Sequence, residues 1–252
     1  MSSASIDPSA KLGKGVTLGQ NVVVGRNVRI GKGTVVGNGC VIHDATIIGK
    51  QVTVFDNTVL GRRPQGVGSM TRRPKKSLPP LRIGDGCVIG ACAVLYRGTS
   101  IGRETLIGDL ASIREECEIG SHTIIARGVT VNYHTRIGNH VKIMDNTHIT
   151  GNMVIEDRVF ISALVSTTND KTMDRCGHGD AGFGGPVIEQ GASIASSVAI
   201  LPGVRVGAYS LVASGTVVNR NVPACKVIAG APPRVVGSVP KEWLRGAGRK
   251  SR

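Results

Sequence analysis

The chain has 252 residues, enough for one large domain. Glycine is abundant at 35 residues and aromatic residues make up only 3%, a composition typical of a thin structure packed from small side chains. The net charge of +14 comes mostly from segments 61–82 and 234–252, and no aromatic stacking surface accompanies it, so nucleic-acid binding is not favoured. No apolar run approaches the ~18 residues of a membrane span.

The first residues lack the apolar core of a signal peptide, and we therefore expect a cytoplasmic protein. A period of six begins almost at once. An aliphatic residue opens ten six-residue units from Ile6 to Leu60, fourteen from Ile83 to Ile161, and six from Ile188 to Val218. Such a period is neither helical nor simply alternating, and it indicates a repeat architecture.

Each position of the unit has its own constraint. The fifth residue is Ala, Val, Thr, Ser or Cys in 28 of 30 units, so it faces inward where only a small side chain fits. Glycine takes the second position in 14 units, where the chain must turn. Three short strands then form a coil of about 18 residues, and stacked coils pair as parallel strands about 4.8 Å apart. The sequence predicts an all-β solenoid of about ten coils.

The first break in the period spans 61–82 and contains seven basic residues and no acidic one. A loop of this length is usually functional or disordered. Its charge suits phosphates and diphosphates, and a solvated basic loop is the alternative.

Four histidines lie in or beside residues 125–162: His122, His134, His140 and His148. His122 and His140 are 18 residues apart, which predicts that they stack on one corner of neighbouring coils. A zinc site of the γ-class carbonic anhydrase kind needs converging imidazoles. The nearest pair, His134 and His140, is six residues apart at equivalent outward corners, so we predict no metal site.

The cysteines do not indicate disulfides. Cys40, Cys87 and Cys117 occupy the small fifth position and are predicted to be buried thiols. Cys92, Cys176 and Cys225 are scattered without CxxC spacing.

Residues 142–170 carry the phrase VIEDRVFI…TTND, which resembles the hexapeptide-repeat N-acetyltransferases that act on nucleotide-linked amino sugars. The resemblance implies a left-handed parallel β-helix, a homotrimer with sites between subunits, and acetyl-CoA as the donor. It places Asn169 and Asp170 at the acceptor sugar and Asn146 near the thioester.

Gly151 stands where some relatives have a Glu or a catalytic His. His148, three residues earlier, is therefore the candidate base or sugar ligand, and His134 is assigned to the acceptor. In sugar O-acetyltransferases of this superfamily a T-x-x-H-x-x-D phrase supplies a histidine base, and Asn169 stands at its place here. A hydroxyl needs a base to attack a thioester, whereas a neutral amine does not. The difference favours an amine acceptor.

Two alternatives stay open. A sugar or nucleotide-sugar O-acyltransferase would use His148 or His178 as base. A β-helix scaffold without catalysis would bind no CoA. Residues 167–187, the second break, contain glycines that suit a mobile flap over a site.

Residues 188–238 closely resemble the acyl-CoA-binding end of hexapeptide acetyltransferases. The resemblance places Ala195 and Ala213 along the pantetheine, Ala229 near the adenine, and Arg220 and Arg234 at the phosphates. The domain is expected to span residues 1–238. A basic tail, 239–252, follows, with a short helix at 240–244.

Overall fold

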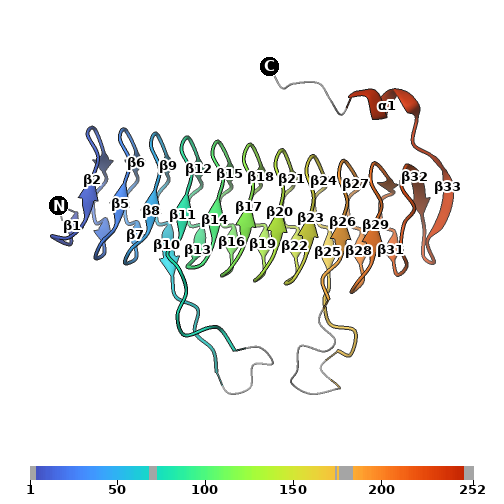
Figure 1. Cartoon of the computed structure of the whole chain (residues 1–252), viewed down its shortest axis with the longest axis horizontal. Coiled ribbons are helices and arrows are strands. Elements are labelled where there is room, and N and C mark those ends of the chain that lie inside the picture. The colour runs from blue at the N-terminus through green and yellow to red at the C-terminus, as the bar shows by residue number, and fades with distance from the viewer. Residues whose placement is uncertain (1–3, 68–72, 174, 176–183, 247–252) are drawn as a thin grey trace.

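The computed structural model describes residues 4–67, 73–173, 175 and 184–246. The chain winds into a long parallel β-helix with three sheets, and its short C-terminal helix lies beside one end (Figure 1). The predicted all-β hexapeptide solenoid is confirmed.

Sheet A holds eleven parallel strands, and in most of them the unit-opening residue is buried while the residue before it faces outward. Its strands are β1 (Ser5–Ile6), β4 (Val23–Val24), β7 (Val41–Ile42), β10 (Val59–Arg62), β13 (Val94–Tyr96), β16 (Ser112–Ile113), β19 (Thr130–Val131), β22 (His148–Ile149), β25 (Ser166–Thr167), β28 (Ala199–Ile200) and β31 (Val217–Val218).

Sheet B holds ten parallel strands, and its outward positions are the most highly charged of the three sheets. Its strands are β2 (Lys11–Leu12), β5 (Arg29–Ile30), β8 (Ile47–Ile48), β11 (Arg82–Ile83), β14 (Ser100–Ile101), β17 (Glu118–Ile119), β20 (Arg136–Ile137), β23 (Val154–Ile155), β26 (Val187–Ile188) and β29 (Arg205–Val206).

Sheet C holds twelve strands, of which the last pairs antiparallel to its neighbour. Its strands are β3 (Thr17–Leu18), β6 (Val35–Val36), β9 (Thr53–Val54), β12 (Val88–Ile89), β15 (Leu106–Ile107), β18 (Ile124–Ile125), β21 (Lys142–Ile143), β24 (Phe160–Ile161), β27 (Ser193–Ile194), β30 (Leu211–Val212), β32 (Lys226–Ala229) and β33 (Arg234–Ser238). Helix α1 spans Lys241–Gly246.

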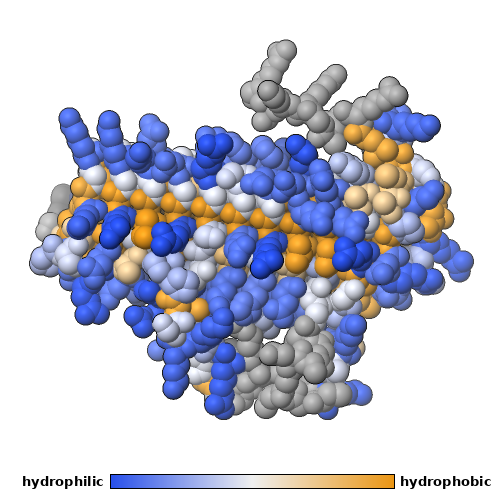
Figure 2. All heavy atoms as spheres, viewed as in Figure 1, coloured by the Kyte–Doolittle hydropathy of each residue, from blue (hydrophilic) through white to orange (hydrophobic). Residues whose placement is uncertain are grey.

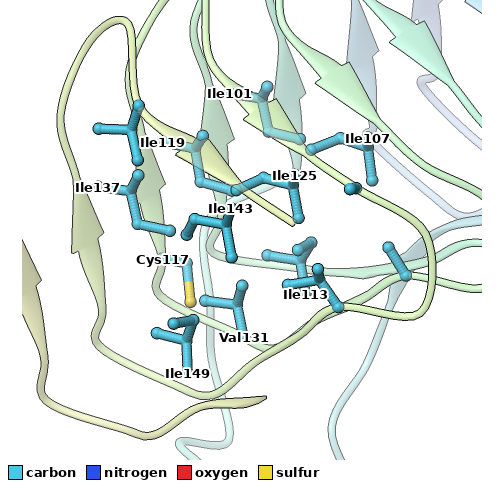
Figure 3. Packing of buried hydrophobic residues seen from close by; sticks show 14 of the residues in the cluster. Ile101, Ile107, Ile113, Cys117, Ile119, Ile125, Val131, Ile137, Ile143 and Ile149 are labelled. Atoms are coloured by element: carbon cyan, nitrogen blue, oxygen red, sulfur yellow. The ribbon is translucent and has the colours of Figure 1, made fainter. Parts of the chain in front are cut away.

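Residues 18 apart face one another across neighbouring coils, as Ile113, Val131 and Ile149 do. These aliphatic side chains form continuous columns inside the tube (Figure 3). The small fifth residues also satisfy the backbone. Thr123, for example, donates to the Gly138 carbonyl at 2.9 Å and accepts from the Val141 N–H at 3.2 Å. Such turns are buried with their backbone polar groups paired, whereas the hydroxyl of Ser210, at the fifth position of a later unit, is buried without a partner among the described residues.

Several predicted boundaries were wrong. The coil count of about ten was low because Thr167 opens a unit with a polar yet buried residue, and Ile228 adds another after Val218. The loops predicted at 61–82 and 167–187 are each shorter, because β10 continues to Arg62, and Thr167 and Val187 belong to strands. The tail helix begins at residue 241 and ends at 246, so it is shifted from the predicted 240–244.

The thiol prediction is confirmed for Cys40, Cys87 and Cys117, which are buried and free. The Cys117 thiol donates to the Asn132 carbonyl at 3.1 Å, and burial raises its pKa to about 12. Cys92 and Cys225 are also free, and Cys176 lies outside the described residues.

Candidate functional site

Both loops leave the helix at one corner. We name each corner by the sheets it joins, so the A–B corner comprises the turns from a sheet A strand to the next sheet B strand. The first loop connects β10 to β11 and the second connects β25 to β26, so both depart from the A–B corner and protrude on one side (Figure 1). Between them, sheet A presents β13, β16, β19 and β22.

A buried ion pair occupies this corner in the turn after β16. The Arg114 guanidinium donates to both carboxylate oxygens of Glu115, at 2.8 and 3.1 Å. The Glu115 side chain is fully buried, whereas that of Arg114 is 26% exposed. Burial lowers the pKa of Arg114, but the hydrogen bonds and charge of Glu115 outweigh it, so the pKa is raised. Arg114 is therefore held as a fixed cation at the surface.

Tyr96 lies between two guanidinium groups at the same corner. The Cζ atoms of Arg62 and Arg114 each lie 5.3 Å from the centre of its ring. Such cation–π contacts stabilise a flat aromatic surface flanked by positive charge. This arrangement joins the end of β10, where the basic loop begins, to the coil of β16.

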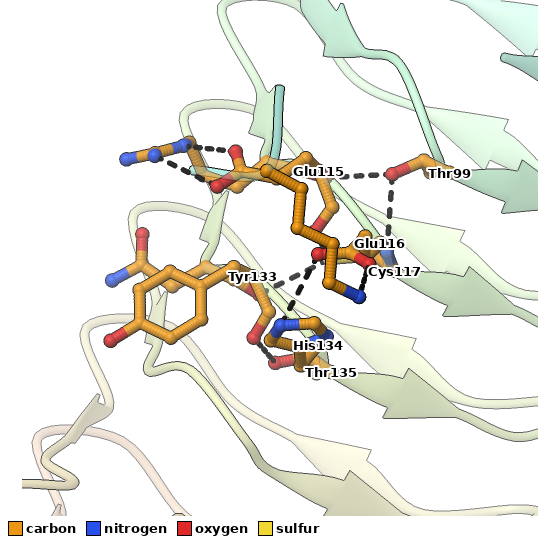
Figure 4. A network of polar contacts seen from close by, with 10 residues as sticks. Thr99, Glu115, Glu116, Cys117, Tyr133, His134 and Thr135 are labelled. Atoms are coloured by element: carbon orange, nitrogen blue, oxygen red, sulfur yellow. Dashed lines mark hydrogen bonds and ion pairs between the residues drawn. The ribbon is translucent and has the colours of Figure 1, made fainter. Parts of the chain in front are cut away.

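Glu116 links the basic loop to the next coil. Its carboxylate accepts from Lys75 Nζ at 2.6 Å and lies 3.2 Å from His134 Nε2 (Figure 4). The Tyr133 ring meets the His134 imidazole edge-on, with centroids 5.9 Å apart. The predicted acceptor ligand His134 thus belongs to a polar cluster that the loop partly covers.

Tyr133 also explains the glycine at 151. A Cβ added to Gly151 would lie 2.6 Å from the Tyr133 ring. Asn169 donates its side-chain amide to the Gly151 carbonyl at 3.2 Å, which ties the second loop to the same corner. The Asp170 carboxylate accepts from the Thr172 N–H at 2.7 Å and from its hydroxyl at 2.8 Å. Asn169 and Asp170 therefore shape the start of the second loop.

His148 projects outward from the middle of sheet A, between the two edges of that sheet. Its Nδ1 lies 2.7 Å from the Thr130 hydroxyl on the next strand. The imidazole is half-buried, and burial lowers its pKa below the ordinary value of 6.5. His148 is therefore neutral near pH 7.

This burial predicts an acid-sensitive contribution to stability. In the unfolded chain His148 becomes protonated near its ordinary pKa, whereas in the folded chain protonation requires a lower pH. The free energy of unfolding therefore falls as pH drops below about 6.5. We expect His148→Gln to lose less stability than the wild type when the pH is lowered from about 7.5 to about 5.5. Urea unfolding at both pH values measures this.

Burial also lowers the pKa of His43, and this histidine is present in both the wild type and the His148→Gln variant. Only the difference between the two slopes therefore reports His148. Equal slopes would contradict the assignment.

The predicted donor-site alanines form a column on the C–A corner. Ala195 and Ala213 follow β27 and β30, and Ala229 ends β32. The Ala195 N–H donates to Val212 and the Ala213 N–H to Ile228, both at 2.9 Å, so the column follows successive coils. Asn146 lies on the same corner, two coils before Ala195, and its φ is 56°.

The two predicted phosphate ligands are not brought together. Arg234 pairs with Ala229 across the β32–β33 ladder and so lies at the end of the alanine column. Arg220 follows β31 on the opposite edge of sheet A, where its neighbour Asn221 accepts from the Arg205 N–H at 2.9 Å.

The sequence prediction missed Tyr96, Arg114, Glu115, Glu116 and Tyr133. The available signal was their place in the unit. Arg114 and Tyr96 stand at second positions where glycine is common, and two consecutive carboxylates occupy a single turn. A large or charged residue in such a turn marks a corner that something else covers.

His122 and His140 stack as predicted, with ring centroids 5.0 Å apart and planes 5° from parallel. They lie on the B–C corner, away from the cluster just described. Within the described ranges no group of three potential metal ligands occurs. In the same part of the chain, no helix combines the length and apolar character needed to cross a bilayer.

Two family models match the chain in overlapping segments. "Hexapeptide repeat of succinyl-transferase" matches residues 80–108, and "Bacterial transferase hexapeptide (six repeats)" matches residues 98–132. The chain belongs to the hexapeptide-repeat acyltransferase superfamily.

Named relatives of this superfamily match parts of the chain. Serine acetyltransferase 4 of Arabidopsis thaliana is 33% identical over 95 residues, 38% of this chain and 26% of that protein. The 2,3,4,5-tetrahydropyridine-2,6-dicarboxylate N-acetyltransferase of Clostridium perfringens is 43% identical over 53 residues, 21% of this chain and 22% of that protein. The chain thus matches about a quarter of the length of these curated relatives.

A solved structure shares the fold over almost the whole chain. The UDP-N-acetylglucosamine acyltransferase from Bacteroides fragilis superimposes with a TM-score of 0.56 and 21% identity, covering 99% of this chain and 78% of that one. At this identity the likeness concerns the architecture of the hexapeptide solenoid.

Proposed function

We propose that this hexapeptide-repeat protein is an acetyl-CoA-dependent N-acetyltransferase that acts on the amine of a nucleotide-linked amino sugar. One observation carries the proposal. A column of small residues on the C–A corner and a polar cluster on the A–B corner flank the same sheet, with His148 between them. Donor and acceptor surfaces therefore border one face.

The donor surface is the alanine column. Small side chains leave the backbone of successive coils open along an edge, and a pantetheine chain can lie along it. Asn146, farther along that edge, is suited to polarise the thioester carbonyl, and such a donor lowers the barrier as charge develops on the oxygen. Arg234, at the other end, is placed for the phosphates of CoA.

The acceptor surface is the A–B corner. The amine nitrogen attacks the thioester carbonyl carbon, the C–N bond forms, the C–S bond breaks, and the CoA thiolate takes up the proton that the nitrogen releases. Holding the two reactants together supplies much of the rate. His134, Asn169 and Asp170 would position the sugar, and neutral His148 would accept a hydrogen bond from the amine.

The loss of Asn169 should weaken the acceptor complex. We expect Asn169→Ala to raise the acceptor KM about tenfold, equivalent to ~1.4 kcal/mol, since the loop loses its bond to the Gly151 carbonyl. The KM for acetyl-CoA should stay within twofold. Steady-state kinetics with each substrate varied in turn distinguish the two.

Asn38→Ala is the matched control, because Asn38 also bonds backbone across a turn but on a distant coil. A rise in both KM values after Asn169→Ala would contradict a specific acceptor role.

A second candidate, a sugar or nucleotide-sugar O-acyltransferase, is favoured by one observation. His148 is a half-buried neutral imidazole, and the neutral form is the one that a general base requires. His178, the other candidate base, lies outside the described residues. An O-acyltransferase would lose activity in a His148→Ala variant with any hydroxyl acceptor.

A homotrimer would bring these faces of neighbouring subunits together. Large apolar side chains are exposed on sheet C and the C–A corner, namely Val35, Phe55, Leu106, Leu110, Phe160 and Leu164. Exposed apolar patches of this kind indicate an interaction surface. The face seen in Figure 2 is that of sheet B, where hydrophilic residues flank and interrupt a narrow hydrophobic band, so it is not the face proposed as the interface. Light scattering would measure the oligomeric state.

Thiol release from acetyl-CoA tests the function directly. The panel contains nucleotide-linked sugars, half with free amines and half with hydroxyls only. Release with an amino sugar alone is the expected result. Release with a hydroxyl-only sugar would overturn N-acetylation in favour of the second candidate. Silence across the panel, with no protection by CoA against thermal unfolding, would favour the non-catalytic scaffold.

A further inference from the structure

A basic strip runs along the first three coils, on sheet B and the B–C corner. Residues 11–50 contain six basic residues and one acidic residue, Asp44. Asp44 accepts from Arg26 at 2.8 Å, and both stand on the A–B corner, across sheet B from the B–C corner. The basic strip is defined by the other five residues, all of which are exposed: Lys11, Lys14, Arg29, Lys32 and Lys50.

The backbone holds the strip in register. Lys11 pairs with Arg29 across neighbouring strands of sheet B. On the B–C corner the carbonyls of Lys14, Lys32 and Lys50 each accept from an N–H of the next coil, at 3.1, 2.9 and 2.9 Å, so these lysines occupy the same turn position of successive coils. They therefore follow one straight edge at intervals of about 4.8 Å. Hydrophilic side chains project from the edge of the N-terminal coils (Figure 2).

Basic residues farther along sheet B have acidic partners. Arg136 lies 3.7 Å from Glu118, and Arg205 lies 2.7 Å from Glu189. In the described part of the chain, none of the five strip residues forms an ion pair. The corner column ends one coil after Lys50, at an aspartate that accepts the Lys50 backbone N–H at 2.7 Å. The N-terminal coils thus present uncompensated positive charge along a rigid edge, which attracts an anionic partner.

The shape and composition of the strip select the kind of partner. Grooves that follow a single-stranded nucleic acid combine cations with aromatic side chains on which bases stack, and residues 11–50 contain no aromatic residue. A straight, open edge of exposed lysines instead suits an extended anionic surface. Clustered Lys and Arg side chains attract the anionic headgroups of a bilayer, and the ammonium groups can donate to their phosphate oxygens.

We propose that the basic strip docks this protein on a bilayer surface rich in anionic lipids. The contact is peripheral, because it uses exposed cations on a rigid edge and no inserted segment. Both loops leave from the A–B corner, so neither loop lies on the docked edge. The proposal stands apart from the proposed function, since it requires neither acyl-CoA nor a sugar.

Vesicle sedimentation with the full chain tests the strip. One set of vesicles is pure phosphatidylcholine, and the other contains equal parts of phosphatidylcholine and phosphatidylglycerol. We expect binding to the second set alone, with release at high salt because exposed charges are screened. The variant Lys14→Gln/Lys32→Gln/Lys50→Gln should lower the partition coefficient about 100-fold, equivalent to ~2.7 kcal/mol.

The matched control removes the same charge from the first loop. Arg63→Gln/Arg73→Gln/Lys76→Gln replaces three exposed cations away from the strip. It should lower the partition coefficient less than about threefold, because charges farther from the surface than a Debye length contribute little. Thermal unfolding of both variants confirms that each is folded before its binding is compared.

Equal weakening by the two triple variants would overturn the strip and indicate attraction to the overall charge. Failure of the wild type to bind the phosphatidylglycerol vesicles would also overturn it. Binding to a single-stranded oligonucleotide in place of vesicles, lost in the triple lysine variant, would overturn the bilayer in favour of nucleic acid. Vesicle binding without any thiol release from acetyl-CoA would count against the proposed function and leave the docking strip standing.

Discussion

Replacing Ala213 with phenylalanine is expected to raise the Kd for acetyl-CoA about 100-fold, equivalent to ~2.7 kcal/mol. Ala213 lies between Ala195 and Ala229 in the column on the C–A corner. A ring at this position would occupy the edge along which the pantetheine is proposed to run. Calorimetric titration with CoA measures the effect.

The variant should still fold, because the same position of the unit already carries an aromatic residue elsewhere. Phe55 follows β9 on the same corner and is 50% exposed. Phe55→Ala is therefore the control, and we expect it to leave CoA affinity unchanged. An Ala213→Phe protein that unfolds like the wild type and binds CoA equally well would remove the column from the donor site.

Replacing Arg114 with alanine is expected to lower the free energy of unfolding by about 3–5 kcal/mol. The change leaves the fully buried Glu115 carboxylate without the guanidinium that bonds to both of its oxygens. It also removes one of the two cations that flank Tyr96. Urea unfolding measures the loss.

Two controls isolate the buried charge. Arg26→Ala breaks an ion pair of the same length whose arginine side chain is 71% exposed, and it should cost far less. The double replacement Arg114→Met/Glu115→Leu removes both charges and should recover much of the stability. If Arg114→Ala costs no more than Arg26→Ala, Glu115 tolerates burial without its partner.

The regular part of the fold was predictable because each position of the unit has one environment. Ile125 opens a unit and is buried, Cys117 takes the fifth position and is buried, and residues 18 apart stack, as His122 and His140 do. A polar residue can also open a unit, as Thr167 does, and a rule based on aliphatic residues misses it.

The corner cluster was less predictable for a physical reason. The repeat pattern treats turn residues as exposed, yet Glu115 is buried because neighbouring coils and its arginine partner cover it. The contact between Lys75 and Glu116 joins a loop with no period to the helix. Such contacts depend on how the loop returns, which the six-residue pattern does not encode. The sequence comparison singled out Gly151 because relatives have another residue there. Only the structure shows that the Tyr133 ring lies against it.

Because both loops leave from the same corner, the distance between them along the helix axis can change only by whole coils. Five steps along sheet A separate β10 from β25, which corresponds to ~24 Å at the spacing of parallel strands. Inserting or deleting a complete coil between them would lengthen or shorten this reach by ~4.8 Å while each loop kept its orientation about the axis. The number of coils thus sets the distance between the two loops. Changing that number would change the size of the ligand that can bridge the loops, without a change in the sequence of either loop.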